Sequence, residues 1–388
     1  MSSNNGSWTR TWTRGIDSGK DLFIDSQDYI YVVGYTYRYS EESDISLLKY
    51  NRTGVLIWSR IWSHEGKGSS IAIDDSENIY IAGNKNEDAF IMKCDNQGEE
   101  IWNRTWGGSN NEWCYGILID SLNDIYIIGE TLSFGFGSYD GFIAKYNSSG
   151  SLLWDVIWGT SESETFNDIT IDDIDNIYVA GQTESNAVLI KFNSSGTELW
   201  NLTVDYYSWS QAIKIDSENN IIYATGHLLQ KFSASGSIIW IRPLPDVDFL
   251  GGLAIDEDDN IYVLEQREIT CPPDNLYFGG ISQCICLGIY LEKYNETGAL
   301  IWEKRCTGCV SASGEGIFLD SVNDIYICGT LYSTTGCGNI NDILLIKNPT
   351  NHSEICYEIY YDLIILGIVI PGIIILAMIF LIIKKRKS

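Results

Sequence analysis

Basic residues are scarce in this chain of 388 residues, where 25 lysines and arginines stand against 52 aspartates and glutamates, for a net charge of −27. A surface this acidic repels the phosphates of nucleic acids and of anionic lipid headgroups, which excludes a nucleic-acid partner. Histidine is rarer still: the three residues His64, His227 and His352 are too scattered to suggest a catalytic group. The sequence also lacks Gly-x-Ser-x-Gly, phosphate-loop and His-Glu-x-x-His motifs, which argues against the enzyme classes that these motifs mark.

What the chain does contain is a phrase of the form Ile-Asp-Ser-x-Asn-Asp-Ile-Tyr-Ile-x-Gly, which returns seven times. The copies lie mostly 40 to 52 residues apart, with one gap of 64, and are anchored by Asp25, Asp74, Asp120, Asp172, Asp216, Asp256 and Asp320. A second phrase, Lys-Tyr-Asn-x-x-Gly-x-x-x-Trp, follows it, as in Lys49 to Trp58. Short strands repeated at this period indicate a β-propeller. We therefore predict an all-β, seven-bladed β-propeller of four-stranded antiparallel blades over residues 7–347.

The ends of the repeat region predict how the ring closes. The seventh lysine, Lys347, has no clear Gly-x-x-x-Trp after it, whereas Trp8-Thr-Arg-Thr-Trp12 matches the tryptophan strand of other copies. We expect the N-terminal strand to complete the last blade and so cover an exposed sheet edge. Residues Glu354 to Tyr357 are the competing candidate for that outer strand.

The two phrases together resemble the SBBP-type β-propeller repeat and, more loosely, the NHL repeat. This resemblance covers residues 7 to about 347 and implies the fold, but it implies almost nothing about activity. The Gly-x-x-x-Trp segment also resembles the tryptophan-docking motif of pyrroloquinoline quinone dehydrogenases, a family with a quinone cofactor, a calcium site and an adjacent pair of cysteines. The chain has no adjacent cysteine pair, so we interpret the motif as packing of each tryptophan on a neighbouring blade and predict no cofactor.

The repeated polar residues are expected to be structural. Each Ile-Asp aspartate is placed to accept hydrogen bonds from backbone amides of the turn that follows it. A catalytic lysine would not be needed seven times, so we assign the repeated lysines, Lys49 through Lys347, to the scaffold. The acidic turns at Asp172–Asp175 and Asp256–Asp259 lack the ordered pattern of a full calcium loop, and no metal site is predicted there.

Beyond the ring the composition changes. After a short linker at 348–362, residues 363–383 are 21 residues without a charge, and the basic tail 384–388 follows. A run of this length is typical of a single membrane-spanning helix. The basic tail favours a cytoplasmic C-terminus, which would place the propeller outside the cell. The N-terminus shows no recognisable signal peptide, so a truncated start and a tail-anchored cytosolic propeller stay open as alternatives.

Sequons and cysteines agree with a cell-surface location. Eight Asn-x-Ser/Thr sequons are candidate glycosylation sites, at Asn5, Asn51, Asn103, Asn147, Asn193, Asn201, Asn295 and Asn351, although turn chemistry alone could have produced several of them. Of ten cysteines, eight crowd the last third and are candidates for disulfides of unknown pairing: Cys271, Cys284, Cys286, Cys306, Cys309, Cys328, Cys337 and Cys356. A zinc site using Cys284-x-Cys286 and Cys306-x-x-Cys309 is the rival interpretation.

Function is best sought where the repeats differ. In a four-stranded meander the constant turns fall on one face of the ring, and the variable connections fall on the other, here called the variable face. The candidate ligand-binding residues on that face are Tyr37, Tyr39, Trp113, Tyr115, Phe134, Phe136, Tyr139, Tyr206, Tyr207, Trp209 and Phe249. Aromatic rings among carboxylates and amides suit recognition of carbohydrate or of a protein loop.

We therefore expect a membrane-anchored binding or adhesion module whose constant face lies toward the membrane. The alternatives are a purely structural envelope protein and a hydrolase or lyase that uses variable-face carboxylates such as Glu112, Asp140, Glu164 and Asp205.

Overall fold

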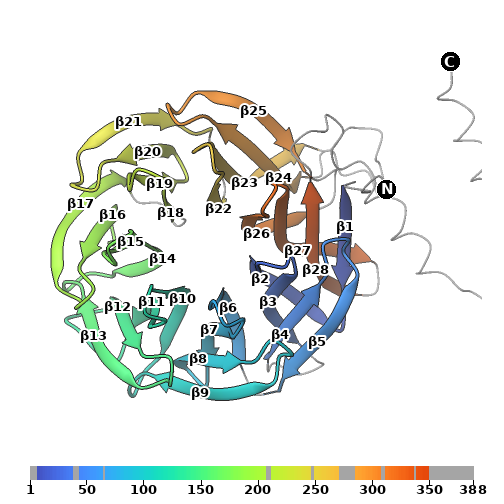
Figure 1. The fold of residues 1–388 in the computed structure, drawn as a ribbon, viewed down its shortest axis with the longest axis horizontal. Coiled ribbons are helices and arrows are strands. Elements are labelled where there is room, and N and C mark those ends of the chain that lie inside the picture. Colours follow the sequence, from blue (N-terminus) through green and yellow to red (C-terminus); the bar gives the residue numbers. More distant parts are fainter. Residues whose placement is uncertain are drawn as a thin grey trace, which may run out of the picture.

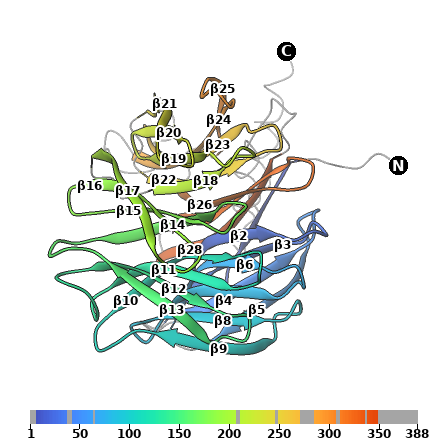
Figure 2. The same cartoon turned by 60° about the vertical axis from the view of Figure 1, so that its left-hand side comes forward.

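The structure is a computed structural model that describes residues 7–37, 43–63, 66–206, 211–245, 249–270, 285–306, 311–335 and 338–348. In these ranges every regular element is a β-strand, and the strands form seven four-stranded sheets arranged around a central axis (Figure 1). Each sheet is one blade, and Figure 2 shows successive blades side by side around the ring. The predicted seven-bladed propeller is confirmed.

The first four blades follow the chain without interruption. Blade 1 consists of β2 (Ile16–Ile24), β3 (Ile30–Tyr37), β4 (Ser43–Tyr50) and β5 (Leu56–Trp62). Blade 2 consists of β6 (Gly66–Ile73), β7 (Ile79–Lys85), β8 (Asp88–Cys94) and β9 (Glu100–Trp106). Blade 3 consists of β10 (Glu112–Ile119), β11 (Ile125–Thr131), β12 (Asp140–Tyr146) and β13 (Leu152–Trp158). Blade 4 consists of β14 (Thr165–Ile171), β15 (Ile177–Gln182), β16 (Asn186–Phe192) and β17 (Glu198–Tyr206).

The remaining three blades complete the ring. Blade 5 consists of β18 (Gln211–Ile215), β19 (Ile221–Thr225), β20 (Leu228–Phe232) and β21 (Ile238–Pro243). Blade 6 consists of β22 (Phe249–Ile255), β23 (Ile261–Thr270), β24 (Ile285–Tyr294) and β25 (Leu300–Arg305). Blade 7 consists of β26 (Ala312–Leu319), β27 (Ile325–Thr335), β28 (Gly338–Asn348) and the N-terminal strand β1 (Trp8–Trp12). In each blade the strand that ends just before the turn aspartate, such as β2 in blade 1 and β26 in blade 7, lies nearest the axis (Figure 1). The strand that carries the repeated tryptophan lies outermost (Figure 1).

The N-terminal strand closes the ring as predicted. Strand β1 pairs antiparallel with β28, and Trp8 lies opposite Lys347. The same pairing of tryptophan with lysine occurs inside the other blades, for example Trp102 opposite Lys93. The competing segment at 354–357 lies outside the described residues.

The turn chemistry inferred from the repeats is also confirmed. In blade 3, Asp120 Oδ1 accepts hydrogen bonds from the amides of Leu122 and Asp124, both at 2.9 Å. Its other oxygen accepts from the Tyr126 hydroxyl at 3.1 Å and from Lys145 Nζ at 3.0 Å. Corresponding lysines pair with the turn aspartates of blades 2 to 7, at 2.6 to 3.9 Å. The repeated lysines therefore neutralise buried turn aspartates.

Blade 5 departs from the repeat. Its phrase carries one extra residue, so Ile222 takes the place of the repeated tyrosine and Tyr223 faces the opposite side. The Tyr223 hydroxyl lies 3.2 Å from the carbonyl oxygen of Val188, in blade 4. The tyrosine of blade 5 therefore lies at the junction with the preceding blade, whereas repeated tyrosines such as Tyr80 lie at the junction with the following blade.

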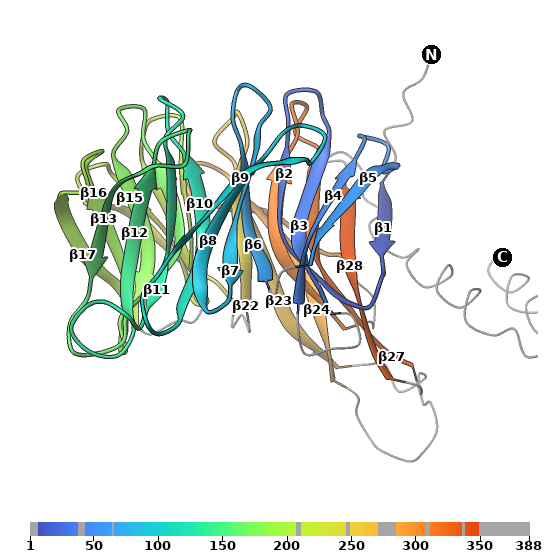
Figure 3. The ribbon, with the colours of Figure 1, turned by 90° about the horizontal axis from the view of Figure 1, so that it is seen from below.

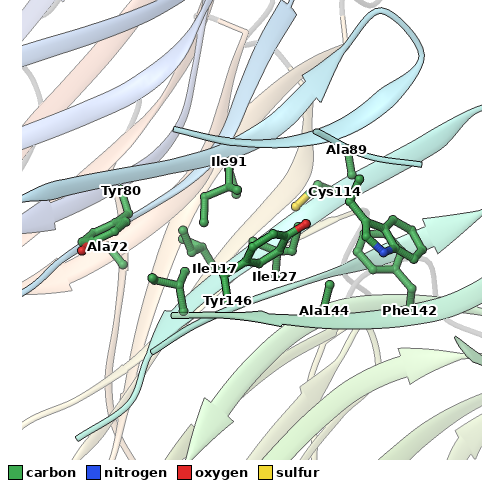
Figure 4. Close-up of a cluster of buried hydrophobic side chains, with 13 residues drawn as sticks. Ala72, Tyr80, Ala89, Ile91, Cys114, Ile117, Ile127, Phe142, Ala144 and Tyr146 are labelled. Carbon is green, nitrogen blue, oxygen red and sulfur yellow. The ribbon is translucent and has the colours of Figure 1, made fainter. Parts of the chain in front are cut away.

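Neighbouring blades are held together by apolar side chains of their facing sheets. Between blades 2 and 3, Tyr80, Ile91 and Trp106 meet Ile127 and Phe142 in one buried cluster (Figure 4). Each further junction repeats this arrangement with β-branched and aromatic residues. Such side chains favour strands, and burying them stabilises the ring by about 25 cal/mol for each Å² of apolar surface removed from water.

Two hairpins extend past the rest of the ring on the variable face. Strands β23 and β24 have 10 residues each, and β27 and β28 have 11, whereas other strands have 5 to 9. Both hairpins project beyond the other blades (Figure 3). Among the described residues no helix has the length and apolar character to cross a membrane, and the predicted span at 363–383 lies outside them.

Candidate functional site: the variable face and central channel

The seven inner strands enclose a channel of about 1150 Å³ along the axis of the ring. In six of the seven inner strands the pairing with the next strand shifts by one residue, which is a β-bulge. A bulge turns an extra side chain out of the ladder. The six bulge residues all line the channel, and they are Lys20, Ser69, Tyr115, Asn167, Gly251 and Glu315. The scaffold is repeated, but the chemistry of the channel wall is not.

The blade 3 side of the channel is aromatic and acidic. The Tyr115 hydroxyl donates to Glu130 Oε1 at 3.0 Å, and Thr165 of blade 4 donates to the other oxygen of Glu130. The ring of Tyr139 lies 5.4 Å from that of Trp113 in an edge-to-face arrangement. Burial raises the pKa of the Glu130 carboxyl, against the hydrogen bonds from Thr165 and Tyr115. This group, which we call the blade 3 shelf, consists of Trp113, Tyr115, Glu130 and Tyr139.

Two lysines lie on the inner strands of blades 1 and 2, Lys20 on β2 and Lys67 on β6. Lys20 Nζ lies 3.4 Å from Glu315 Oε2, which joins blades 1 and 7. Burial lowers the pKa of Lys20, but the carboxylate of Glu315 and the hydroxyls of Tyr35 and Tyr332 together outweigh it, so the pKa is raised. Lys67 lies over the rings of Tyr35 and Tyr37, at 5.2 and 5.7 Å from their centroids, and these two rings contact edge to face.

Two aspartates connect inner strands along the wall. Asp21 accepts hydrogen bonds from Ser70 Oγ at 2.7 Å and from the Ile71 amide at 3.0 Å, across to blade 2. Asp168 accepts from the Ile213 amide at 2.9 Å and lies 3.8 Å from Lys214 Nζ, across to blade 5. Burial raises the pKa of Asp21 to about 6 despite these hydrogen bonds. An acid with this pKa is suited to proton exchange near neutral pH.

The structure brings some predicted ligand-binding residues together and separates others. Trp113, Tyr115 and Tyr139 meet on the blade 3 shelf, and Phe249 lines the channel from blade 6. Phe134 instead packs on Trp106, with ring centroids 5.4 Å apart, while Phe136 is 77 % exposed. Tyr39, Tyr207 and Trp209 lie outside the described residues, and nothing is described of the Tyr206 side chain.

Sequence reasoning missed the polar half of the channel. Lys20, Glu130 and Lys214 belong to strands that look constant, whereas the predicted ligand-binding residues belong to the variable connections. A comparison of the bulge position across the six copies that have one, where it varies from lysine to tyrosine to glutamate, is the signal that could have found the channel wall.

The carboxylates suggested for hydrolase or lyase chemistry do not face the open channel. Glu112, Asp140 and Glu164 are each 0 % exposed and lie between neighbouring blades. Nothing is described of the Asp205 side chain.

Few of the predicted disulfide cysteines fall within the described residues. Cys328 is a buried free thiol in β27, whereas the sequence analysis made it a candidate for a disulfide. Cys306 is buried after β25, with its amide donating to Ile289 O at 2.7 Å. The side chain of Cys286 and all of Cys271, Cys284, Cys309, Cys337 and Cys356 are not described. Among the described residues no group of three or more potential metal-ligating side chains occurs, and the side chains of Cys284, Cys286 and Cys309, on which the zinc alternative depends, lie outside them.

Four predicted glycosylation sites lie in the constant turns. Asn51, Asn147, Asn193 and Asn295 each accept, through Oδ1, a hydrogen bond of 2.7 to 2.8 Å from the hydroxyl two residues later. The serine or threonine of each sequon is thus part of the turn. Asn103 and Asn201 lie on outer strands and donate to Glu100 and Glu198, while Asn5 and Asn351 lie outside the described residues. Glycosylation stays a prediction.

Comparison with known proteins supports the fold alone. No family model matches the chain. An uncharacterised WD repeat-containing protein of Acanthamoeba polyphaga mimivirus is 24 % identical over 364 residues, which span 74 % of this chain and 26 % of that protein. The regulatory protein FlaEY of Caulobacter vibrioides is 22 % identical over 184 residues, spanning 39 % of this chain and 19 % of FlaEY. The chain thus spans about a quarter or less of these relatives.

Solved propellers of similar architecture include lyases. A streptogramin B lyase matches with a TM-score of 0.57 and 11 % identity, over 88 % of this chain and 98 % of the lyase. A catalytically inactive virginiamycin B lyase from Staphylococcus aureus, solved with quinupristin, matches with a TM-score of 0.57 and 10 % identity, over 88 % and 99 %.

Proposed function

We propose that this propeller is a recognition module that binds carbohydrate at the mouth of its channel, with the blade 3 shelf as the main contact. The supporting observation is a cluster of three aromatic rings around one carboxylate: Tyr115 donates to Glu130, Trp113 lies opposite Glu130 in the sheet, and the ring of Tyr139 contacts that of Trp113. The neighbouring channel wall is rich in hydroxyl and amide groups. Sugar rings stack on aromatic faces, and carboxylates and amides orient sugar hydroxyls.

The shelf has the exposure that a binding surface needs. Tyr115 is 37 % exposed although its hydroxyl is held by Glu130, so the ring is fixed in orientation while one side stays open. A ring fixed before binding loses little conformational entropy when the ligand arrives, and this favours affinity. Tyr115 also occupies a bulge position, which points it into the channel.

A carbohydrate array probed with the purified chain tests this proposal. For a bound glycan, Tyr115→Ala should weaken binding by about tenfold or more, because a central aromatic contact is lost. Leu122→Ala is the matched control, since Leu122 is 73 % exposed on a constant turn of the same blade. Equal affinity for the two variants would contradict the role of the shelf. Binding of a protein partner in place of any glycan would contradict the choice of ligand class.

We further propose that the module is displayed on the cell surface, anchored by residues 363–383. Strand β28 ends at Asn348 on the constant face, about 15 residues before the predicted span, so the constant face would lie toward the membrane and the shelf away from it. Cysteine-specific labelling of intact cells tests this topology. A cysteine at Phe136 should react with an impermeant reagent, and labelling only after lysis would support the tail-anchored alternative instead.

The enzyme alternative calls for a separate assay. Asp21, with its pKa raised to about 6 by burial, is a channel-wall acid suited to proton transfer. If the bound glycan were turned over and Asp21→Asn abolished the turnover, the propeller would be a hydrolase or lyase and not only a recognition module.

A further inference from the structure

Three junctions between blades carry a pair of adjacent carboxylates near the variable face, and all of these carboxylates except the half-buried Asp88 are buried. The first member lies five residues before the repeated lysine of one blade, and the second lies at or near the start of the inner strand of the next blade. These junction pairs are Asp342 with Asp17 between blades 7 and 1, Asp88 with Glu112 between blades 2 and 3, and Asp140 with Glu164 between blades 3 and 4.

The junction of blades 3 and 4 shows the geometry most clearly. A methyl carbon placed on Gly159 would lie 2.2 Å from Asp140 Oδ1 and 2.6 Å from Glu164 Oε2, so the two oxygens converge on one point. Asp140 Oδ2 accepts from the Phe136 amide at 3.1 Å, but Oδ1 is buried without a hydrogen-bond partner in the described structure. Asp140 and Glu164 are both 0 % exposed, so bulk water does not supply the missing partner.

Each of the other two junctions repeats one part of this arrangement. A methyl carbon on Gly107 would lie 2.4 Å from Asp88 Oδ1 and 2.2 Å from Glu112 Oε2. At the junction of blades 7 and 1, Asp17 Oδ1 and Asp342 Oδ1 are both buried, and within the described ranges neither has a hydrogen-bond partner.

The junction pairs lack the counter-charge that the turn aspartates have. No lysine or arginine of the described ranges lies within 4.0 Å of any of the six carboxylates, whereas Lys145 lies 3.0 Å from turn aspartate Asp120. Burial, and then the neighbouring carboxylate, raises the pKa values of Asp88 and Asp140. Two adjacent buried carboxylates are unfavourable unless a proton or a cation neutralises them.

We propose that these three junctions are calcium sites, each ion bridging the third strand of one blade and the start of the next blade. The polar side-chain atoms that converge are all oxygens, which are the ligands that Ca²⁺ takes at 2.3 to 2.6 Å. Zinc prefers nitrogen and sulfur ligands, which these pairs do not offer. Bound ions would join neighbouring blades across the face that carries the shelf.

The chain contains a matched control for this proposal. Asp44 lies at the corresponding position of blade 1, but the residue facing it at the start of blade 2 is Gly66 instead of an acid. Asp44 therefore has the same place in the fold, with glycine instead of an acid at the start of the next inner strand. In blade 4 the position is occupied by Asn186, which carries no charge.

The test uses the full chain, kept in mild detergent because of residues 363–383 and stripped of metal with EDTA. Calorimetric titration with CaCl₂ should find three sites, and 1 mM CaCl₂ should raise the melting temperature by about 5 °C or more. Trp12, Trp106 and Trp158 each lie directly before a junction segment, so added Tb³⁺ should luminesce on tryptophan excitation and be displaced by Ca²⁺.

The double variant D140N/E164Q should lose one of the three sites, while Asp44→Asn should keep all three. The neutral amides of the double variant also remove the repulsion between the two carboxylates. In EDTA the double variant should therefore melt no lower than the unmodified chain, which separates loss of the site from loss of the fold. The absence of any calcium effect, together with a melting temperature in EDTA that rises more steeply in the unmodified chain than in D140N/E164Q as the pH falls from 7 to 5, would show that the pairs share a proton and would overturn the proposal. Equal stabilisation by Mg²⁺ would overturn the assignment to calcium.

Discussion

Trp102 of blade 2 lies against Gly150 of blade 3, so that a Cβ atom at Gly150 would be 3.1 Å from the indole atoms Cδ2 and Cε3. The same contact joins Trp8 to Gly54, Trp58 to Gly98 and Trp154 to Gly196. In blade 2, Arg104 follows the tryptophan and donates to Gly150 O at 2.9 Å. The predicted packing of each tryptophan on a neighbouring blade is therefore confirmed. The glycine is required for two reasons, its φ of +79° and the closeness of the indole ring.

Gly150→Ala should lower the free energy of unfolding by about 1–3 kcal/mol, because the added methyl group strains a left-handed backbone and meets Trp102. Urea denaturation measures this change. Ser148→Ala in the same exposed turn is the control and should stay within about 0.5 kcal/mol of the unmodified chain. Equal effects of the two substitutions would contradict the contact.

Removing residues 1–12 should open the ring. Strand β28 would lose its pairing with β1 and become an exposed sheet edge, which favours self-association. The melting temperature should fall, and size-exclusion chromatography should show oligomers. Deleting only residues 1–6, which precede β1, is the control and should change neither measurement. An unchanged monomer after the longer deletion would show that another segment covers β28.

Lys145→Met should lower the free energy of unfolding by about 3–5 kcal/mol, because it leaves the buried carboxylate of Asp120 without its cation. The Lys145 and Asp120 side chains are 7 % and 1 % exposed. Lys214→Met is the matched control, since Lys214 lies 3.8 Å from Asp168 but is 39 % exposed, and its loss should cost about 1 kcal/mol or less. Thermal unfolding followed by circular dichroism compares the two variants.

The free energy of unfolding should fall as the pH rises, because Asp21 then loses the proton that it holds in the folded state. Its pKa is 3.8 when unfolded and about 6 in the folded protein, so between these values the folded state holds a proton that the unfolded state releases. The stabilising effect is complete below about pH 4 and is lost as the pH passes through 6, with a total on the order of 1–3 kcal/mol. Asp21→Asn should remove this part of the slope when unfolding is measured from pH 4 to 7, and parallel curves would contradict it.

Two cysteines should be inert to alkylation in the native protein. Burial raises the pKa values of the Cys94 and Cys114 thiols to about 12, so almost no thiolate forms at pH 8. Iodoacetamide should label neither residue in the folded chain and both in guanidinium chloride, as read by mass spectrometry. Rapid native labelling of Cys114 would mean that the junction between blades 2 and 3 opens readily.

Most of the fold could be predicted from the sequence because one repeated motif builds every blade. The spacing of Asp120, Lys145 and Trp154 predicts one blade, and the match of Trp8 to the tryptophan strands predicts the closing strand. These inferences succeed because the same few contacts recur in every copy. The one-residue shift at Tyr223 was not predicted. A single inserted residue leaves the repeat recognisable but changes which side of the strand the following residues face.

The candidate site was less predictable. Phe134 looked like a ligand contact but packs on Trp106, because exposure depends on the neighbouring strand and not on the local sequence. The pairing of Asp140 with Glu164 depends on how two blades pack, and no spacing within one repeat contains that information. The bulge that directs Tyr115 into the channel is a change of register, which a periodic pattern hides.

The pairing of β1 with β28 also has a consequence for synthesis on the ribosome. Strand β1 leaves the exit tunnel before the other strands of the blades, and its partner segment, Ile343–Lys347, leaves it last among them. At bacterial or eukaryotic elongation rates the N-terminal segment would wait on the order of tens of seconds before that partner emerged. During this interval the nascent chain exposes an unpaired edge strand. This is when a chaperone that covers exposed strands would protect it most from aggregation.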